Sequence, residues 1–158
     1  MIRLEPMTPD ELQAYLDRSV PEYAADHVRS GRWRPEDAVE RSRAEHQQLL
    51  PKGVDTPDQY LRTVVDPDVG ERVGEVWYAL QRQDGSPQLF VYWIGIAERH
   101  RRKGYASAVL LQVEDEARRL GAARVVLHVF ADNVGARALY ETLGYSTTNL
   151  LMAKSVRR

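Results

Sequence analysis

Two apolar segments with an amphipathic one between them constrain this fold more than any other feature of the chain. Residues 88–96, QLFVYWIGI, and 124–130, RVVLHVF, are nearly continuous apolar runs, as expected of strands buried on both faces. Apolar residues within 104–120 recur every three or four positions, which predicts a helix that ends at Gly121. Segments of these lengths favour a right-handed strand–helix–strand unit in which the two strands are parallel.

The remaining patterns place this unit in a mixed α/β or α+β fold. Residues 72–81 alternate and are rich in β-branched and aromatic side chains, which predicts a strand, with a turn after it at Asp84-Gly85. Asn133 can cap a further helix that ends at Gly144. The other expected elements are a strand at 1–7, helices at 9–18 (capped by Thr8), 20–31 (capped by Ser19) and 34–53, a short helix at 56–66, and one or two strands at 145–156.

Composition narrows the classes of function. A chain of 158 residues suits one domain, and a net charge of −1 argues against a dedicated nucleic-acid binder. The absence of cysteine excludes disulfides, thiolate metal sites and a cysteine nucleophile, and fits a reducing compartment. No leader-like or membrane-spanning apolar run is present, so we expect a cytoplasmic protein that binds no membrane, nucleic acid or metal.

A basic turn leads into the 104–120 helix. Arg101, Arg102 and Lys103 precede Gly104, and Ala106 keeps the next helical position small. The start of a helix exposes unpaired N–H groups and partial positive charge, and a position after a parallel strand is where α/β folds bind ligands. The pattern therefore indicates a seat for a phosphate group, and a solvated basic turn is the alternative. The P-loop and dinucleotide glycine patterns are absent.

Two sequence patterns, at 101–106 and 133–145, are spaced along the chain as in a known protein family. Residues 96–145 resemble the acetyl-CoA-binding half of the GNAT superfamily of N-acetyltransferases. The family's pyrophosphate loop, [QR]-x-x-G-x-[GA], is matched by Arg101, Arg102, Lys103, Gly104, Tyr105 and Ala106. Its later signature is matched in register by Asn133, Ala136, Leu139, Tyr140, Gly144 and Tyr145. Overall the resemblance covers roughly residues 72–154.

The resemblance implies one N-acetyltransferase domain over 1–158, with a helical acceptor side at 1–66 and an acetyl-CoA-binding part at 72–154. Its sheet would be mixed and mostly antiparallel, with about seven strands, about four helices and a diverging central parallel pair. The reaction implied is acetyl transfer from acetyl-CoA to a primary amine in a direct ternary complex. A non-catalytic acyl-CoA sensor and an unrelated α/β domain are the alternatives, and a homodimer through the C-terminal strands is one possible assembly.

The resemblance also implies roles for single residues. Amides from Arg102 to Ala106 would hold the pyrophosphate, and those near Ile94 and Ile96 would bind the pantetheine and polarise the thioester carbonyl. Asn133 and Ala136 would contact the cofactor, although Asn133 also suits a helix cap. Tyr140 would be the general acid that protonates the departing thiolate, the alternative being a core tyrosine.

The general base is the least constrained part of the site. Many family members carry an acidic residue on the strand before the pyrophosphate loop, but residues 88–96 contain no carboxylate. Glu75, on the adjacent predicted strand, is the first candidate, directly or through a water molecule, and a solvent-facing strand residue is its alternative. His128 and Tyr92 are weaker candidates for the same role.

Overall fold

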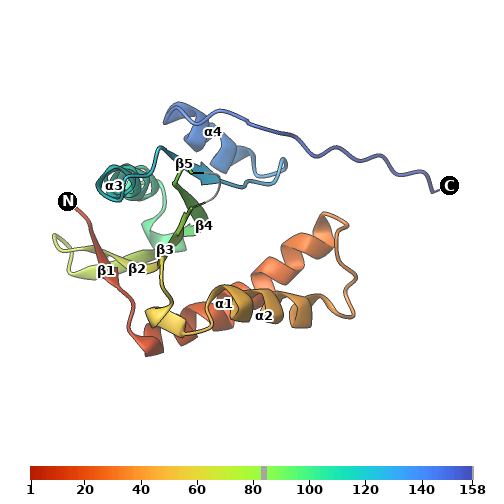
Figure 1. The fold of residues 1–158 in the computed structure, drawn as a ribbon, viewed down its shortest axis with the longest axis horizontal. Helices are drawn as coiled ribbons and strands as arrows, with labels where there is room; N and C mark the ends of the chain where they lie inside the picture. Colours follow the sequence, from red (N-terminus) through yellow and green to blue (C-terminus); the bar gives the residue numbers. More distant parts are fainter. Residues whose placement is uncertain (83–84, 158) are drawn as a thin grey trace. The chain divides into compact units, whose positions relative to one another are not determined.

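A five-stranded sheet is the framework of the computed structural model, which describes residues 1–82 and 85–157 (Figure 1). Its strands lie in chain order, and neighbours from β1 to β4 run antiparallel, whereas β4 and β5 run parallel. The elements are β1 (Arg3–Pro6), α1 (Pro9–Arg29), α2 (Ala38–Leu49), β2 (Gln59–Asp66), β3 (Glu71–Gln81), β4 (Gln88–Ile96), α3 (Tyr105–Arg119), β5 (Arg124–Leu127) and α4 (Val134–Thr142). The chain divides into two units, Met1–Leu127 and His128–Arg158.

The predicted strand–helix–strand unit is confirmed. β4 has the expected bounds, and it pairs in parallel with β5 from Gln88–Arg124 to Val91–Leu127. The mixed, mostly antiparallel fold class is confirmed as well. The expected number of about seven strands is wrong, because the described residues form five, and β5 ends at Leu127 instead of residue 130.

Helices cover both faces of the sheet in the unit Met1–Leu127 (Figure 1). On one face, Val109 and Val113 of α3 pack against strand residues such as Leu89, and these three side chains are fully buried. On the other face, Leu12 and Tyr15 of α1 pack against strand residues and Leu50. Burying a large apolar side chain contributes about 1.5–3 kcal/mol, so these two clusters fix the helices on the sheet.

The first helix is longer than the sequence predicts. Thr8 caps it as expected, in a capping box in which Glu11 bonds back to the Thr8 amide. The helix continues through Pro21 to Arg29, so the predicted break with a second cap at Ser19 is wrong. A proline inside a helix costs about 3 kcal/mol. Burial of α1 side chains on both sides of Pro21 offsets this cost.

Two other expectations are wrong. Residues 56–66 were expected to be helical, but Gln59–Asp66 form β2, which pairs with both β1 and β3. Its β-branched residues, Thr63, Val64 and Val65, favour a strand once neighbours supply ladder bonds on both edges. Residues 145–156 were expected to form one or two strands, but no strand is assigned there within the described chain. A strand needs a ladder partner, and Leu150, Leu151 and Met152 remain exposed.

The turn predicted at Asp84-Gly85 includes Asp84, which lies outside the described residues, and Gly85 has a positive φ of 72°. No helix in the described part of the chain combines the length and apolar character needed to cross a bilayer.

Candidate active site

The end of β4 is the first component of the candidate site. The ladder between β4 and β5 stops at the Val91–Leu127 pair, while β4 continues to Ile96. On its other edge, β4 stays paired with β3 as far as Ile96–Gly74. The register shifts between Val91 and Trp93, so Tyr92 is an extra residue, a β-bulge. Ile94 and Ile96 thus lie on a stretch of β4 that β5 does not pair, which is where cofactor-binding amides are predicted.

The bulge gathers aromatic side chains on one face of the sheet. Tyr92 and Trp93 are adjacent in sequence, yet both belong to the cluster on the face that α1 covers. The ring of Tyr92 stacks on Trp77 with centroids 4.5 Å apart, and Trp93 lies 6.2 Å from Tyr15. The buried indole Nε1 of Trp93 has no hydrogen-bond partner among the described atoms. Tyr92, a weaker candidate for the general base, therefore packs within an aromatic cluster.

Gly95 and Gly74 bring the backbones of β4 and β3 unusually close together. A Cβ atom on Gly74 would lie 2.1 Å from the carbonyl oxygen of Gly95. A Cβ atom on Gly95 would lie 2.8 Å from Nε1 of Trp93, because the indole folds over this glycine. The two backbones therefore approach closely at Gly95, a few residues after the bulge at Tyr92.

The turn before α3 has the backbone geometry of an anion seat. Arg102 and Gly104 both have left-handed φ values, 64° and 82°, so the chain curls sharply into the helix. Within the described chain, the amides of 102–104 form no hydrogen bond, and no side chain caps α3. Tyr105 and Ala106 begin the helix, where no intrahelical acceptor exists. These amides and the helix dipole are available to a phosphate group.

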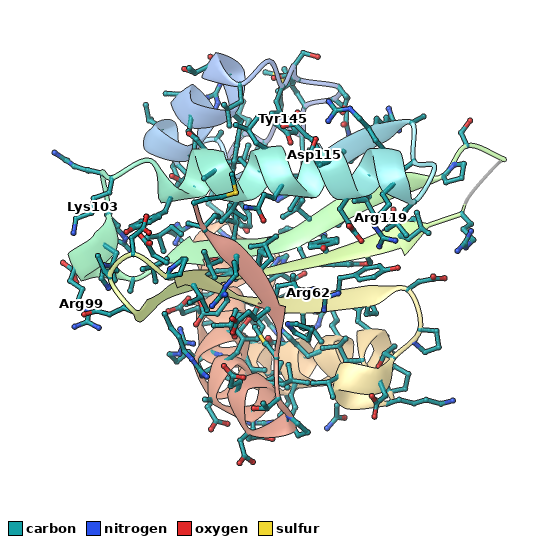
Figure 2. All side chains as sticks on the ribbon, turned by 90° about the vertical axis from the view of Figure 1, so that its left-hand side faces the viewer. Arg62, Arg99, Lys103, Asp115, Arg119 and Tyr145 are labelled. Atoms are coloured by element: carbon teal, nitrogen blue, oxygen red, sulfur yellow. The ribbon has the colours of Figure 1, made fainter. Side chains whose placement is uncertain are left out.

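The basic side chains around this turn have different partners. The Nε atom of Arg101 donates to the carbonyl oxygen of Ile96 at 3.1 Å, which ties the turn to the end of β4. The side chains of Arg102 and Lys103 form no hydrogen bond or ion pair with the rest of the described chain. Figure 2 shows Lys103 and Arg99 projecting outward at the same end of the molecule, near the start of α3. Arg102 and Lys103 are thus the two cations of the turn that remain for a ligand.

The carboxylate of Glu75 faces α1. Glu75 lies opposite Gly95 of β4, and its side chain is only 20% exposed. Its Oε1 accepts a hydrogen bond from Arg18 of α1, an ion pair that the sequence analysis missed because the partners are 57 positions apart. The neighbouring Glu11 is fully engaged by the Thr8 amide, the Thr63 hydroxyl and Arg72, and the first of these bonds is the main reason why its pKa is lowered. Glu75 is therefore the less engaged carboxylate on this face.

His128 does not occupy the buried strand position that the sequence suggests. β5 ends one residue earlier, and the side chain of His128 is exposed. Its ring contacts Phe130 edge-on, with centroids 4.9 Å apart.

The second sequence signature lies in the unit His128–Arg158. Asn133 caps α4 as expected, since its side chain accepts a hydrogen bond from the amide of Ala136 at 3.3 Å. Tyr140 is half-buried on the apolar face of this helix, with the ring of Tyr145 edge-on at 6.0 Å. Burial raises the pKa of Tyr140 above its ordinary value, so the phenol is protonated at neutral pH. The catalytic and cofactor roles of these residues stay predictions.

The comparisons with known proteins agree with this geometry. A model of the Acetyltransferase (GNAT) family matches residues 23–145. Two proteins of Bacillus subtilis (strain 168), named the uncharacterized N-acetyltransferases YdgE and YycN, are each 36% identical, covering 97% and 98% of this chain and 97% and 99% of their own lengths. The crystal structure of YycN, a putative acetyltransferase, superposes over 100% of both chains with a TM-score of 0.92 at 35% identity. A putative acetyl transferase from Pyrococcus furiosus shares the fold, with a TM-score of 0.68 at 23% identity over 99% of both chains. The chain therefore belongs to the GNAT family of acetyltransferases.

Proposed function

We propose that this enzyme transfers the acetyl group of acetyl-CoA to a primary amine, in one step within a ternary complex. The observation that best supports the proposal is the turn at 102–106, where the family's pyrophosphate motif coincides with unpaired amides and two unpaired cations. The glycine at 104 supports it further, because its left-handed φ of 82° strains other residues and no protein atom lies within 4 Å of its would-be Cβ.

In the proposed reaction the amine nitrogen bonds to the thioester carbonyl carbon, and the carbon–sulfur bond breaks. The amine must lose a proton and the sulfur must gain one, so one base and one acid are required. Tyr140 is the proposed acid at the sulfur, and Glu75, directly or through water, is the proposed base. The amides of Ile94 and Ile96 would stabilise the negative charge that develops on the carbonyl oxygen.

The proposed activity is tested by following thiol release from acetyl-CoA with a panel of amines. The panel should hold a polyamine, an amino-acid amide, an aminoglycoside, and peptides with a free N-terminus or lysine. Release that depends on one class of amine supports the proposal and identifies the acceptor. Tight binding of CoA without release by any amine would favour the acyl-CoA sensor instead.

Replacing Glu75 by glutamine should lower kcat/KM roughly 10²-fold, as loss of a general base does. The base acts in its unprotonated form, so the kcat/KM of the wild type should fall toward low pH. The variant should lack this fall, which is the acid limb of the pH profile. The measurement is the pH profile of kcat/KM with the best amine. Arg18→Gln is the matched control, because it breaks the same ion pair and leaves the carboxylate in place. If Glu75→Gln keeps the acid limb, Glu75 is not the base.

A further inference from the structure

The turn between β2 and β3 contacts the segment that leads into α3. From the turn, Asp66 and Glu71 present carboxylates, and from the segment, Arg99, His100 and Tyr105 meet them. We call these five residues the loop clamp. None of its side-chain contacts is required by the family motif, since only Tyr105 lies within it and there at an unspecified position.

The shortest contact of the loop clamp joins the ends of β2 and α3. The Tyr105 hydroxyl donates a hydrogen bond of 2.6 Å to Oδ2 of Asp66, while the other carboxylate oxygen accepts from the amide of Asp68. The hydrogen bond raises the pKa of Tyr105 and lowers that of Asp66. Both groups therefore keep the protonation states that this bond needs throughout the neutral pH range.

The second contact of the loop clamp lies on the β3 side. His100 is 7% exposed, and its Nε2 lies 2.9 Å from Oε2 of Glu71, without the alignment of a hydrogen bond. Arg99 approaches the same oxygen at 3.3 Å, and the Tyr105 ring lies edge-on to His100 at 6.2 Å. The loop clamp thus contacts the chain on both sides of residues 102–104, whose own amides form no hydrogen bond in the described chain.

We propose that the loop clamp positions the 101–106 turn for the cofactor, and that Tyr105 and Asp66 act as positioning residues through their mutual hydrogen bond. The inference rests on the proposed function of the turn. Its physical basis is that Arg102 has a left-handed backbone conformation, which a residue other than glycine keeps only where the surrounding structure fixes it. When the binding-competent conformation is less populated, the apparent affinity falls by the same factor.

The test compares CoA binding by Tyr105→Phe, Asp66→Ala and Asp66→Asn with that of the wild type, by calorimetry on the full chain. Tyr105→Phe and Asp66→Ala both break the hydrogen bond and should raise the Kd for CoA roughly tenfold. Asp66→Asn can still hydrogen-bond the hydroxyl and the Asp68 amide, so its Kd should stay within about threefold of the wild type. The double variant Tyr105→Phe/Asp66→Ala should bind no worse than either single variant.

Kinetics separates positioning from a general loss of structure. In Tyr105→Phe the KM for acetyl-CoA should rise with the Kd, while kcat at saturating acetyl-CoA should change less than about twofold. The control is Tyr60→Phe, whose hydroxyl forms no hydrogen bond within the described chain and whose loss should leave both constants unchanged. Wild-type protein that fails to bind CoA would refute the proposed function itself. Normal CoA binding by Tyr105→Phe, or a fall in kcat and thermal stability together, would overturn the positioning role alone.

Discussion

Replacing Tyr140 by phenylalanine should lower kcat by roughly 10²- to 10³-fold while the Kd for acetyl-CoA stays unchanged. The phenol hydroxyl is the only group lost, and the ring keeps its place on the apolar face of α4. We expect a fall in kcat in the lower part of the range usual for loss of a general acid, because burial raises the pKa of Tyr140. A donor whose pKa lies above the working pH transfers its proton less readily.

The pH dependence provides a second measure of the same role. A general acid works only when protonated, so wild-type kcat should fall only as the pH rises through the raised pKa of Tyr140. Tyr140→Phe should lack this basic limb. Tyr60→Phe is the matched control, since it removes a tyrosine hydroxyl elsewhere. An unchanged kcat in Tyr140→Phe would remove Tyr140 from the mechanism and leave it as a packing residue.

Gly74→Ala should be the most damaging small substitution in the sheet. The new methyl group would lie 2.1 Å from the backbone oxygen of Gly95, and backbone cannot move aside as a flexible side chain can. Overpacking of this kind costs about 3 kcal/mol, which corresponds to a fall in Tm of roughly 6–12 °C for a chain of this size. β3 and β4 would separate where Ile96 pairs with Gly74, so the KM for acetyl-CoA should rise as well.

Gly135→Ala is the control for this prediction. Gly135 lies in the first turn of α4, and nothing occupies the space within 4 Å of its would-be Cβ. Alanine there should change stability by no more than about 1 kcal/mol. Thermal unfolding of both variants decides the matter. Equal Tm values for Gly74→Ala and the wild type would show that β3 and β4 can tolerate a wider spacing than the structure has.

The sequence predicts most reliably where one local pattern decides the outcome. β4 and α3 have strong and different periodicities, and Asn133 and Thr8 cap their helices as their residue types suggest. The predictions fail where contacts with elements distant in the sequence determine the secondary structure. Nothing in 59–66 shows that strands lie on both sides of it. Likewise, α1 continues past Pro21 because Ala24 is buried against Trp33 and Ala38, which its own segment does not reveal.

The candidate site likewise contains features that a local motif predicts and features that depend on distant contacts. The amides of the 101–106 turn follow from a short motif, so sequence reasoning could find them. The side chains that hold this turn could not be found in that way, because the Tyr105–Asp66 bond spans 39 positions. For Arg18 and Glu75 the separation is 57 positions, and neither residue stands out in its own segment. Charged partners on distant elements become visible only when the fold brings them together.

The extra residue at Tyr92 has a mechanical consequence. A bulge bends its strand and increases the local twist, and this one comes directly after the last rung that β4 shares with β5. The ladder between the two strands therefore ends at a bend that is built into β4 itself. Val91 and Ile94 both face α3, although they are three positions apart. In a chain lacking residue 92 they would be two positions apart, so the side chains of β4 would alternate regularly between the two faces and each remaining one would keep its present face. Deleting residue 92 is thus the change that would straighten β4 just beyond its last pair with β5.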